Sequence, residues 1–177
     1  PHGANRMLAL LSKMMNLAEK WEYRPLNSNP CRHIDRYKEK GREVYLTMSK
    51  IEKIGLAIKE LEKTESPYIL AAIKMLLFTG RRTSEILTLR WEYLDFENSK
   101  MHLPETKTGA KTFHLSSTTK QLLFSLQSRE GFVFKSVVSG KRVTIVRHIW
   151  KKICKLADID NVRVHDLRHT YASLAIH

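Results

Sequence analysis

The spacing of apolar residues predicts a chain built mainly of helices. In residues 4–21 the apolar positions recur at intervals of three and four: Leu8, Leu11, Met15 and Ala18. These intervals place them on one side of a helix, which we expect to be buried. Residues 25–46 contain prolines, asparagines and a charged run instead, a composition typical of an exposed connector. We therefore expect a terminal helix of an upstream domain in residues 1–24, a linker in 25–46 and a separate domain in 47–177.

Helix start and stop signals divide the first half of residues 47–177. Thr47 is suited to cap one helix, and Ser66 followed by proline is suited to start a second. The second helix, residues 68–78, is apolar on nearly every side, and Gly80 would end it. We expect this helix to be the buried centre of the domain.

The second half of residues 47–177 changes character. Alternating segments at 101–103 and 112–115, separated by a turn that contains Gly109, predict a small antiparallel sheet. Helical spacing returns in residues 117–129, 143–157 and from His165 onward. The expected fold class is therefore mainly α with one small antiparallel β-sheet.

The charge of the chain indicates a polyanionic partner. It has 31 Lys and Arg against 18 Asp and Glu, a formal net charge of +13. Nucleic acid is the first interpretation and an anionic membrane surface the second. No stretch approaches the roughly 18 apolar residues that a membrane span needs, and two distant cysteines give neither a disulfide framework nor a zinc-ligand spacing. We expect a cytoplasmic protein without a metal ion or other cofactor.

Two segments carry candidate chemistry. In residues 79–91 Arg82 precedes Glu85 by three positions, close enough on a helical turn for the carboxylate to orient a guanidinium towards a phosphate. In residues 164–174 His165 and Arg168 share one side of a first helical turn, where free backbone N–H groups also favour an anion. Taken singly, each segment is also compatible with an ordinary solvated surface or a helix cap.

Taken together, the two segments are far more specific. Thr-Gly-x-Arg-x-x-Glu-Ile-Leu-x-Leu-x-Trp at 79–91, Lys-Thr-Gly at 107–109 and His-x-x-Arg-His-Thr at 165–170 resemble the tyrosine recombinase, or phage integrase, family. The resemblance covers residues 47–177 and implies the catalytic-domain fold of that family. It implies that four residues are catalytic: Arg82, Lys107, His165 and Arg168. Glu85 would be the supporting acid, and Arg81 falls at the variable position of the motif.

The resemblance implies site-specific DNA recombination or integration by a bacterial or phage-encoded protein. The phosphodiester would be broken by metal-independent transesterification through a 3′-phosphotyrosyl intermediate in the full-length protein. The two arginines would stabilise the charge of the transition state, Lys107 would protonate the leaving 5′ oxygen, and His165 would hold a phosphate oxygen or exchange a proton. The partners would be double-stranded DNA and further copies of the protein, as a tetramer on DNA, and no membrane.

Other basic residues are expected to position the DNA. Residues 143–157 separate an apolar stripe from a basic one, and basic residues also precede them. We expect six side chains to contact the DNA backbone without reading sequence: Arg81, Lys141, Arg142, Arg147, Lys151 and Lys155. A charge stripe of this kind is otherwise an ordinary solvated helix face.

The chain differs from the family pattern in its nucleophile. The nucleophilic tyrosine of the family follows several helices beyond the second arginine, and residues 1–177 end nine positions after Arg168. Tyr171 takes the position of a packed core aromatic, so we expect this chain to be cut before its nucleophile and inactive in strand cleavage. A non-catalytic DNA-binding module of the same fold is the alternative. A metal-dependent nuclease is less favoured because no cluster of Asp and Glu suits two-metal chemistry.

Overall fold

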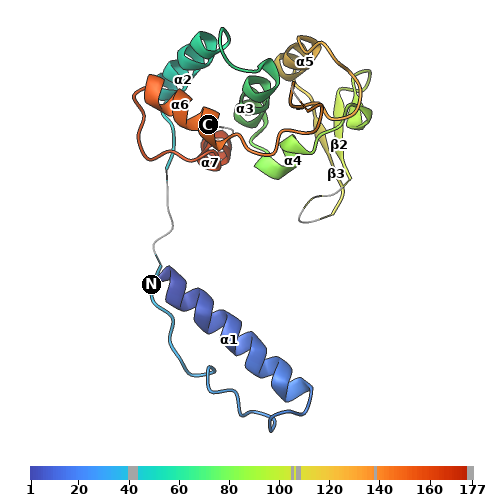
Figure 1. Cartoon of the computed structure of the whole chain (residues 1–177). Helices are drawn as coiled ribbons and strands as arrows, with labels where there is room; N and C mark the ends of the chain where they lie inside the picture. The colour runs from blue at the N-terminus through green and yellow to red at the C-terminus, as the bar shows by residue number, and fades with distance from the viewer. Residues whose placement is uncertain (40–43, 105, 107–108, 138, 175–177) are drawn as a thin grey trace. The chain divides into compact units, whose positions relative to one another are not determined.

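The structure is a computed structural model that describes residues 1–39, 44–104, 106, 109–137 and 139–174. The chain divides into two compact units, Pro1–Arg42 and Glu43–His177. The first contains one long helix with a returning segment, and the second contains several helices and a small sheet (Figure 1). The expected class, mainly α with one small antiparallel sheet, is confirmed.

The first unit is a helix held to a returning segment by polar contacts. Helix α1, His2–Lys20, confirms the helix predicted in residues 4–21. The Asn29 side chain donates to the carbonyl oxygen of Ser12 at 3.1 Å and to Oδ1 of Asn16 at 2.7 Å, and its backbone N–H donates to the Glu19 carboxylate at 2.6 Å. These contacts bury Glu19 and Asn29.

The predicted buried face of α1 is wrong in part, because Leu11 is exposed and its neighbours on that face are only half-buried. The returning segment is itself polar, so it covers the polar side of the helix instead of an apolar one. Large apolar side chains on the other side remain exposed in this unit: Met7, Leu10, Met14 and Trp21.

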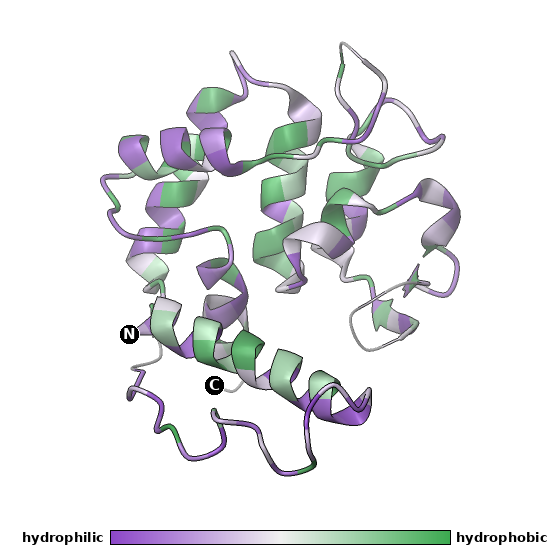
Figure 2. Ribbon diagram, turned by 60° about the horizontal axis from the view of Figure 1, so that its bottom comes forward, coloured by the Kyte–Doolittle hydropathy of each residue, from purple (hydrophilic) through white to green (hydrophobic). Residues whose placement is uncertain are grey.

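The second unit is organised around one apolar helix. Its helices are α2 Met48–Leu61, α3 Pro67–Thr79, α4 Thr83–Leu87, α5 Ser117–Phe124, α6 Arg147–Leu156 and α7 Asp166–Leu174, with a 3₁₀ turn at Trp91–Tyr93. Helix α3 contacts α4, α5, α6 and α7, and α2 packs on α6. Figure 2 colours α3 as hydrophobic along most of its length, which agrees with its buried side chains. The prediction of a buried central helix is confirmed.

A small antiparallel sheet lies beside this helical core. Strands β1 Leu94–Asp95, β2 Lys100–Leu103 and β3 Lys111–His114 are ordered β1-β2-β3. Met101 of β2 pairs with Phe113 of β3, and both lie on the core side, Met101 fully and Phe113 partly buried. The two longer strands were predicted, whereas β1, only two residues long, carries no alternating pattern that would reveal it.

Helix α6 begins later than predicted because the residues before it form backbone pairs with another segment. Residues 143–157 were expected to be one helix, but α6 begins at Arg147. The Val143 N–H donates to the carbonyl oxygen of Phe134 at 2.8 Å, and Arg142 pairs with Lys135 in a β-bridge. The segment before α6 is therefore extended, because its backbone groups find partners across the loop rather than within a helix.

Candidate functional site

The turn between α3 and α4 requires glycine. Gly80 ends α3 in the left-handed conformation, with φ of 58°. A Cβ atom at this position would lie 2.5 to 2.8 Å from three atoms of Tyr171 on α7. Only a residue without a side chain allows both this backbone conformation and this close approach. Helix α7 is thereby brought directly against the turn that carries Arg81 and Arg82.

Arg82 is oriented by Glu85, as the sequence predicted. Its Nη1 donates to Oε1 of Glu85 at 2.9 Å, and its backbone N–H donates to Oε2 of the same carboxylate at 3.1 Å. The Glu85 side chain is only 5% exposed, while the Arg82 side chain is 36% exposed. The buried Glu85 carboxylate thus orients the Arg82 guanidinium, and the exposed part of the Arg82 side chain remains accessible to a ligand.

Arg168 reaches the same turn from α7. Its Nη1 donates to the carbonyl oxygen of Gly80 at 2.7 Å, two residues before Arg82. Thr170, buried on the same helix, accepts a hydrogen bond from the Leu46 N–H at 3.1 Å and donates to the carbonyl oxygen of Asp166. Sequence reasoning assigned Thr170 no role, although it ties α7 to the start of the second unit. The structure therefore brings Arg168 to the loop that presents Arg82.

Arg81 belongs to this cluster as well. Its Nε donates to the carbonyl oxygen of Thr79 at 3.1 Å, and its guanidinium carbon lies 3.7 Å from the ring centroid of Phe113 on β3. In the described part of the chain, neither Arg81 nor Arg168 forms an ion pair with a carboxylate. Among the described residues, one carboxylate, that of Glu85, therefore pairs with a cluster of three guanidinium groups.

The pKa shifts reflect this crowding of charge. Burial lowers the pKa of Arg81 from its ordinary value, and the nearby charge of Arg168 lowers it further, while Glu85 opposes both. Burial alone would raise the pKa of Glu85, but the hydrogen bonds from Arg82 and the charges of Arg82 and Arg168 hold that pKa below its ordinary value. The cluster is consequently positive and would be relieved by a bound anion.

His165 lies immediately before α7, beside an open groove. Its ring meets that of His169 edge-on, with 5.4 Å between centroids. The groove has a volume of about 1080 Å³ and is lined by three parts of the second unit: Thr83 at the start of α4, residues 144–147, 150 and 151 at the start of α6, and residues 162–165. The groove therefore runs from the neighbour of Arg82 past His165 to α6.

The basic face of α6 opens towards solvent. Arg147, Lys151 and Lys155 are exposed, and the first two line the groove. The opposite face is buried and consists of Val146, just before the helix, with Ile149, Trp150 and Ile153. Lys141 and Arg142 are exposed in the preceding loop. These five predicted DNA-contact residues thus belong to one segment, whereas Arg81 belongs to the arginine cluster.

Lys107, the fourth predicted catalytic residue, lies outside the described residues.

Within the described part of the chain there is no group of three or more His, Cys, Asp or Glu side chains placed to hold a metal ion. No described helix is long and apolar enough to cross a membrane. Burial raises the pKa of Cys154 to about 11, with the Asp160 charge contributing.

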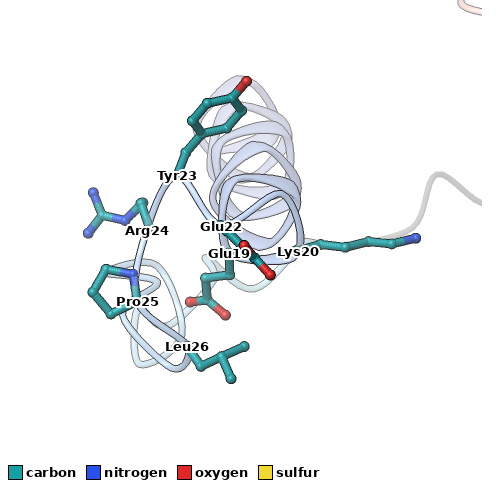
Figure 3. A pocket seen from close by; sticks show the side chains of 7 residues that line it. All are labelled: Glu19, Lys20, Glu22, Tyr23, Arg24, Pro25 and Leu26. Carbon is teal, nitrogen blue, oxygen red and sulfur yellow. The ribbon is translucent and has the colours of Figure 1, made fainter.

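A second hollow, in the first unit, gathers none of the predicted site residues. It has a volume of about 530 Å³ and is lined by residues 19, 20 and 22–26 at the end of α1 (Figure 3). The Glu19 carboxylate at its wall already accepts hydrogen bonds from the Asn29 N–H and from Arg32. The candidate site is therefore the cluster in the second unit.

The motifs that converge in the second unit match one family. Residues 44–176 match the sequence model of the phage integrase family. The chain belongs to this family. Arg82, His165 and Arg168 belong to the motifs of this family. Arg82 lies in the turn after Gly80, where Glu85 holds it, and Arg168 reaches the same turn from α7.

Relatives within the phage integrase family act on DNA according to their names. The chain is 32% identical over 165 residues to the shufflon-specific DNA recombinase of Escherichia coli, covering 92% of this chain and 40% of that protein. It is 29% identical over 117 residues to the prophage integrase IntF of Escherichia coli K12, covering 62% of this chain and 25% of that protein. The chain thus spans less than half the length of either relative.

The fold is also that of a solved phage integrase. A lambda integrase (75–356) dimer bound to a COC′ core site superimposes with a TM-score of 0.75 at 18% sequence identity, covering 97% of this chain and 65% of that one. At this identity the likeness establishes the fold alone. It confirms the tyrosine recombinase fold that the motifs of the sequence implied.

Proposed function

We propose that this chain is the phosphate-binding part of a site-specific DNA recombinase or integrase. In the full-length protein the reaction would be a metal-independent transesterification through a 3′-phosphotyrosyl intermediate. The observation that carries the proposal is the convergence of Arg82 and Arg168 on one turn, one fixed by Glu85 and the other by the Gly80 carbonyl oxygen. Fixed guanidinium groups recognise phosphate oxygens and need little reorganisation when charge develops.

The proposed catalytic roles follow from the chemistry of each side chain. Arg82 and Arg168 would stabilise the negative charge on the non-bridging oxygens, and Glu85 would keep Arg82 in place. His165, exposed beside the groove, would hold a phosphate oxygen or exchange a proton near neutral pH. Lys107 would protonate the leaving oxygen; this assignment rests on the motif.

The DNA backbone would follow the groove. Arg147 and Lys151 line the same groove as His165, so the basic face of α6 begins beside one of the proposed catalytic residues. Lys141, Arg142 and Lys155 would extend this path, and Arg81 would contact the backbone at the arginine cluster. Such contacts position a duplex without reading its sequence.

The first unit would belong to a further DNA-clamping domain. We propose that residues 1–24 form the last helix of a core-binding domain, that residues 25–46 are a linker and that residues 47–177 belong to a catalytic domain. The exposed apolar side of α1, which the returning segment leaves uncovered, supports this role because such a face packs against other helices. Self-association on DNA, as a tetramer, is proposed by analogy with the lambda integrase tetramer bound to a Holliday junction.

The test compares arginine variants in DNA binding and in cleavage. In residues 1–177, Arg82→Met and Arg168→Met should each reduce the slope of log K against log salt by about 0.9, because each removes about one neutralised phosphate. Arg129→Met is the matched control, since Arg129 stacks on Phe124 outside the site. In the full-length protein, Arg82→Met should abolish the covalent protein–DNA adduct on nicked duplexes. Binding that depends on both arginines, with no adduct from the full-length protein, would favour the non-catalytic alternative.

A further inference from the structure

We propose that Phe113 on strand β3 is a positioning residue that holds Arg81 as a third guanidinium of the phosphate site. The inference rests on the proposed function and adds a residue pair to it. Neither Phe113 nor the Arg81 side chain belongs to the fixed positions of the sequence motif. The pair joins the sheet to the arginine cluster through one contact.

Two contacts fix the plane and the direction of the Arg81 guanidinium. Its face lies on the Phe113 ring, with 3.7 Å from the guanidinium carbon to the ring centroid, and its Nε is tied to the Thr79 carbonyl oxygen at 3.1 Å. A guanidinium has five N–H donors in one plane, so these contacts occupy one face and one edge. The two terminal nitrogens remain to donate to a ligand in that plane.

The Phe113 ring is itself held in place. It packs against the hydrophobic core from β3, and its residue pairs with the fully buried Met101 of β2. A ring fixed by the core gives Arg81 a fixed support, so the orientation of the guanidinium is set before a ligand arrives. A free arginine would have to lose its rotamer freedom on binding.

Three successive residues of the turn after α3 reach three different elements. The Gly80 carbonyl oxygen accepts from Arg168 of α7, Arg81 stacks on Phe113 of β3, and Arg82 pairs with Glu85 of α4. Arg81 is also close enough to Arg168 for each charge to disfavour the other, and burial acts in the same direction on the pKa of Arg81. Glu85 supplies one negative charge against these three guanidinium groups, so an anion bound between them would reduce their mutual repulsion.

A double-mutant cycle in residues 1–177 tests the pair. The measurement is the affinity for a short duplex at fixed salt, with its salt slope, for Arg81→Met, Phe113→Leu and the double variant. We expect Arg81→Met to weaken binding about tenfold and to reduce the slope by about 0.9, because it removes a charged phosphate contact. Phe113→Leu should weaken binding roughly fivefold while the slope changes little, because the charge remains but is no longer held.

The interaction between the two residues is the decisive result. In the background of Arg81→Met, Phe113→Leu should change affinity less than twofold, and Phe113→Tyr, which keeps the ring, should bind like the unmodified chain. Arg81→Lys should keep the salt slope but lose affinity, since its ammonium group lacks the planar fork. The same cycle on Arg129 and Phe124, stacked at 5.1 Å outside the site, is the control and should leave binding unchanged.

Two results would overturn the inference. One is an equal loss from Phe113→Leu in both backgrounds, which would mean that the ring acts only through the core. The other is an unchanged slope in Arg81→Met while Arg82→Met and Arg168→Met reduce it. If all three arginine variants leave the slope unchanged, the proposed function itself fails. Thermal unfolding of each variant identifies losses that are due to misfolding.

Discussion

Gly80 meets two separate constraints at the centre of the site. Its φ of 58° is costly for any residue with a side chain, and a Cβ atom would approach the Tyr171 ring to 2.5 Å. The tightness of this approach allows α7 to deliver Arg168 to the Gly80 carbonyl oxygen. A change at this residue therefore acts on stability and on the arginine cluster together.

We predict that Gly80→Ala destabilises the second unit by about 2–4 kcal/mol, because backbone strain adds to a steric clash. Urea unfolding followed by circular dichroism measures the loss. Gly55→Ala is the matched control: a Cβ there meets nothing within 4 Å, and alanine is the better helix former in α2. Adding Tyr171→Ala to Gly80→Ala should relieve the clash with the ring atoms at 2.5 and 2.6 Å, but not the approach to the Tyr171 Cβ at 2.8 Å or the backbone strain, so it should restore stability only in part. Equal stability of the Gly80 and Gly55 variants would contradict the close packing of α7.

Glu85 should make stability depend on acid pH. Its folded-state pKa lies below the ordinary value of 4.5, despite burial, because Arg82 and Arg168 favour the charged form. The unfolded carboxyl therefore binds a proton at higher pH than the folded one. The stabilising effect is complete above about pH 4.5 and is lost as the pH falls further.

Glu85→Gln should accordingly lower the unfolding free energy at pH 7 by about 1–2 kcal/mol, since Arg82 loses a charged hydrogen-bond partner. The difference in stability between this variant and the unmodified chain should narrow as the pH falls below about 4.5. Urea unfolding of both proteins across pH 7 to 3 measures it. Glu39 and Asp95 also have lowered pKa values, so the comparison of the two proteins isolates Glu85. A constant difference across this range would refute the assignment.

At the scale of an element, α6 separates two functions on two faces. Ile149, Trp150 and Ile153 fill the core, while Arg147, Lys151 and Lys155 face solvent. The indole N–H of Trp150 donates to the carbonyl oxygen of Val162 at 2.9 Å, which fixes the loop before His165 to the helix. The basic face can therefore change without loss of the packing that places the site.

We predict that Lys151→Ala with Lys155→Ala reduces the salt slope of DNA binding by about 1.8, because two phosphate contacts are lost. Fluorescence anisotropy over a salt series measures the slope. Lys152→Ala removes one charge from the same helix, but Lys152 is paired with Glu65 at 2.6 Å, so the salt slope of this variant should stay unchanged. A reduction of about 0.9 in Lys152→Ala, half that of the double variant, would show that net charge matters and that the position of the charge on the helix does not.

At the scale of the molecule, residues 1–177 should bind DNA but not become covalently attached to it. Arginines lower the barrier only for an attack that a nucleophile delivers. Tyr68 is buried, and Tyr171, although 38% exposed, lies with its ring against Gly80 one turn after Arg168, so we expect neither to act as the nucleophile. Incubation with nicked duplexes followed by a denaturing gel should reveal no adduct. An adduct lost in Tyr171→Phe would overturn this assignment.

The sequence alone determined the elements whose signals are local. The N-cap at Thr47, the stop at Gly80 and the apolar helix between Pro67 and Thr79 depend on residues close together in the chain. The orientation of Arg82 by Glu85 is also local, since three positions on a helical turn bring the two side chains together. The spacing of apolar residues did not predict the start of α6 or the short strand β1, because both depend on backbone pairing across a turn with a neighbouring segment.

Only the tertiary structure decided which distant residues share the site. The approach of Arg168 to Gly80 spans 88 positions and depends on α7 packing against α3. The stacking of Arg81 on Phe113 depends on the register of a strand that the sequence describes only as alternating. Motif resemblance named Arg82 and Arg168, but it gave Thr170, the last residue of the second motif, no role, and Phe113 lies outside the motifs. The physical reason is that a side chain acts through its neighbours in space, and packing of the core sets those neighbours.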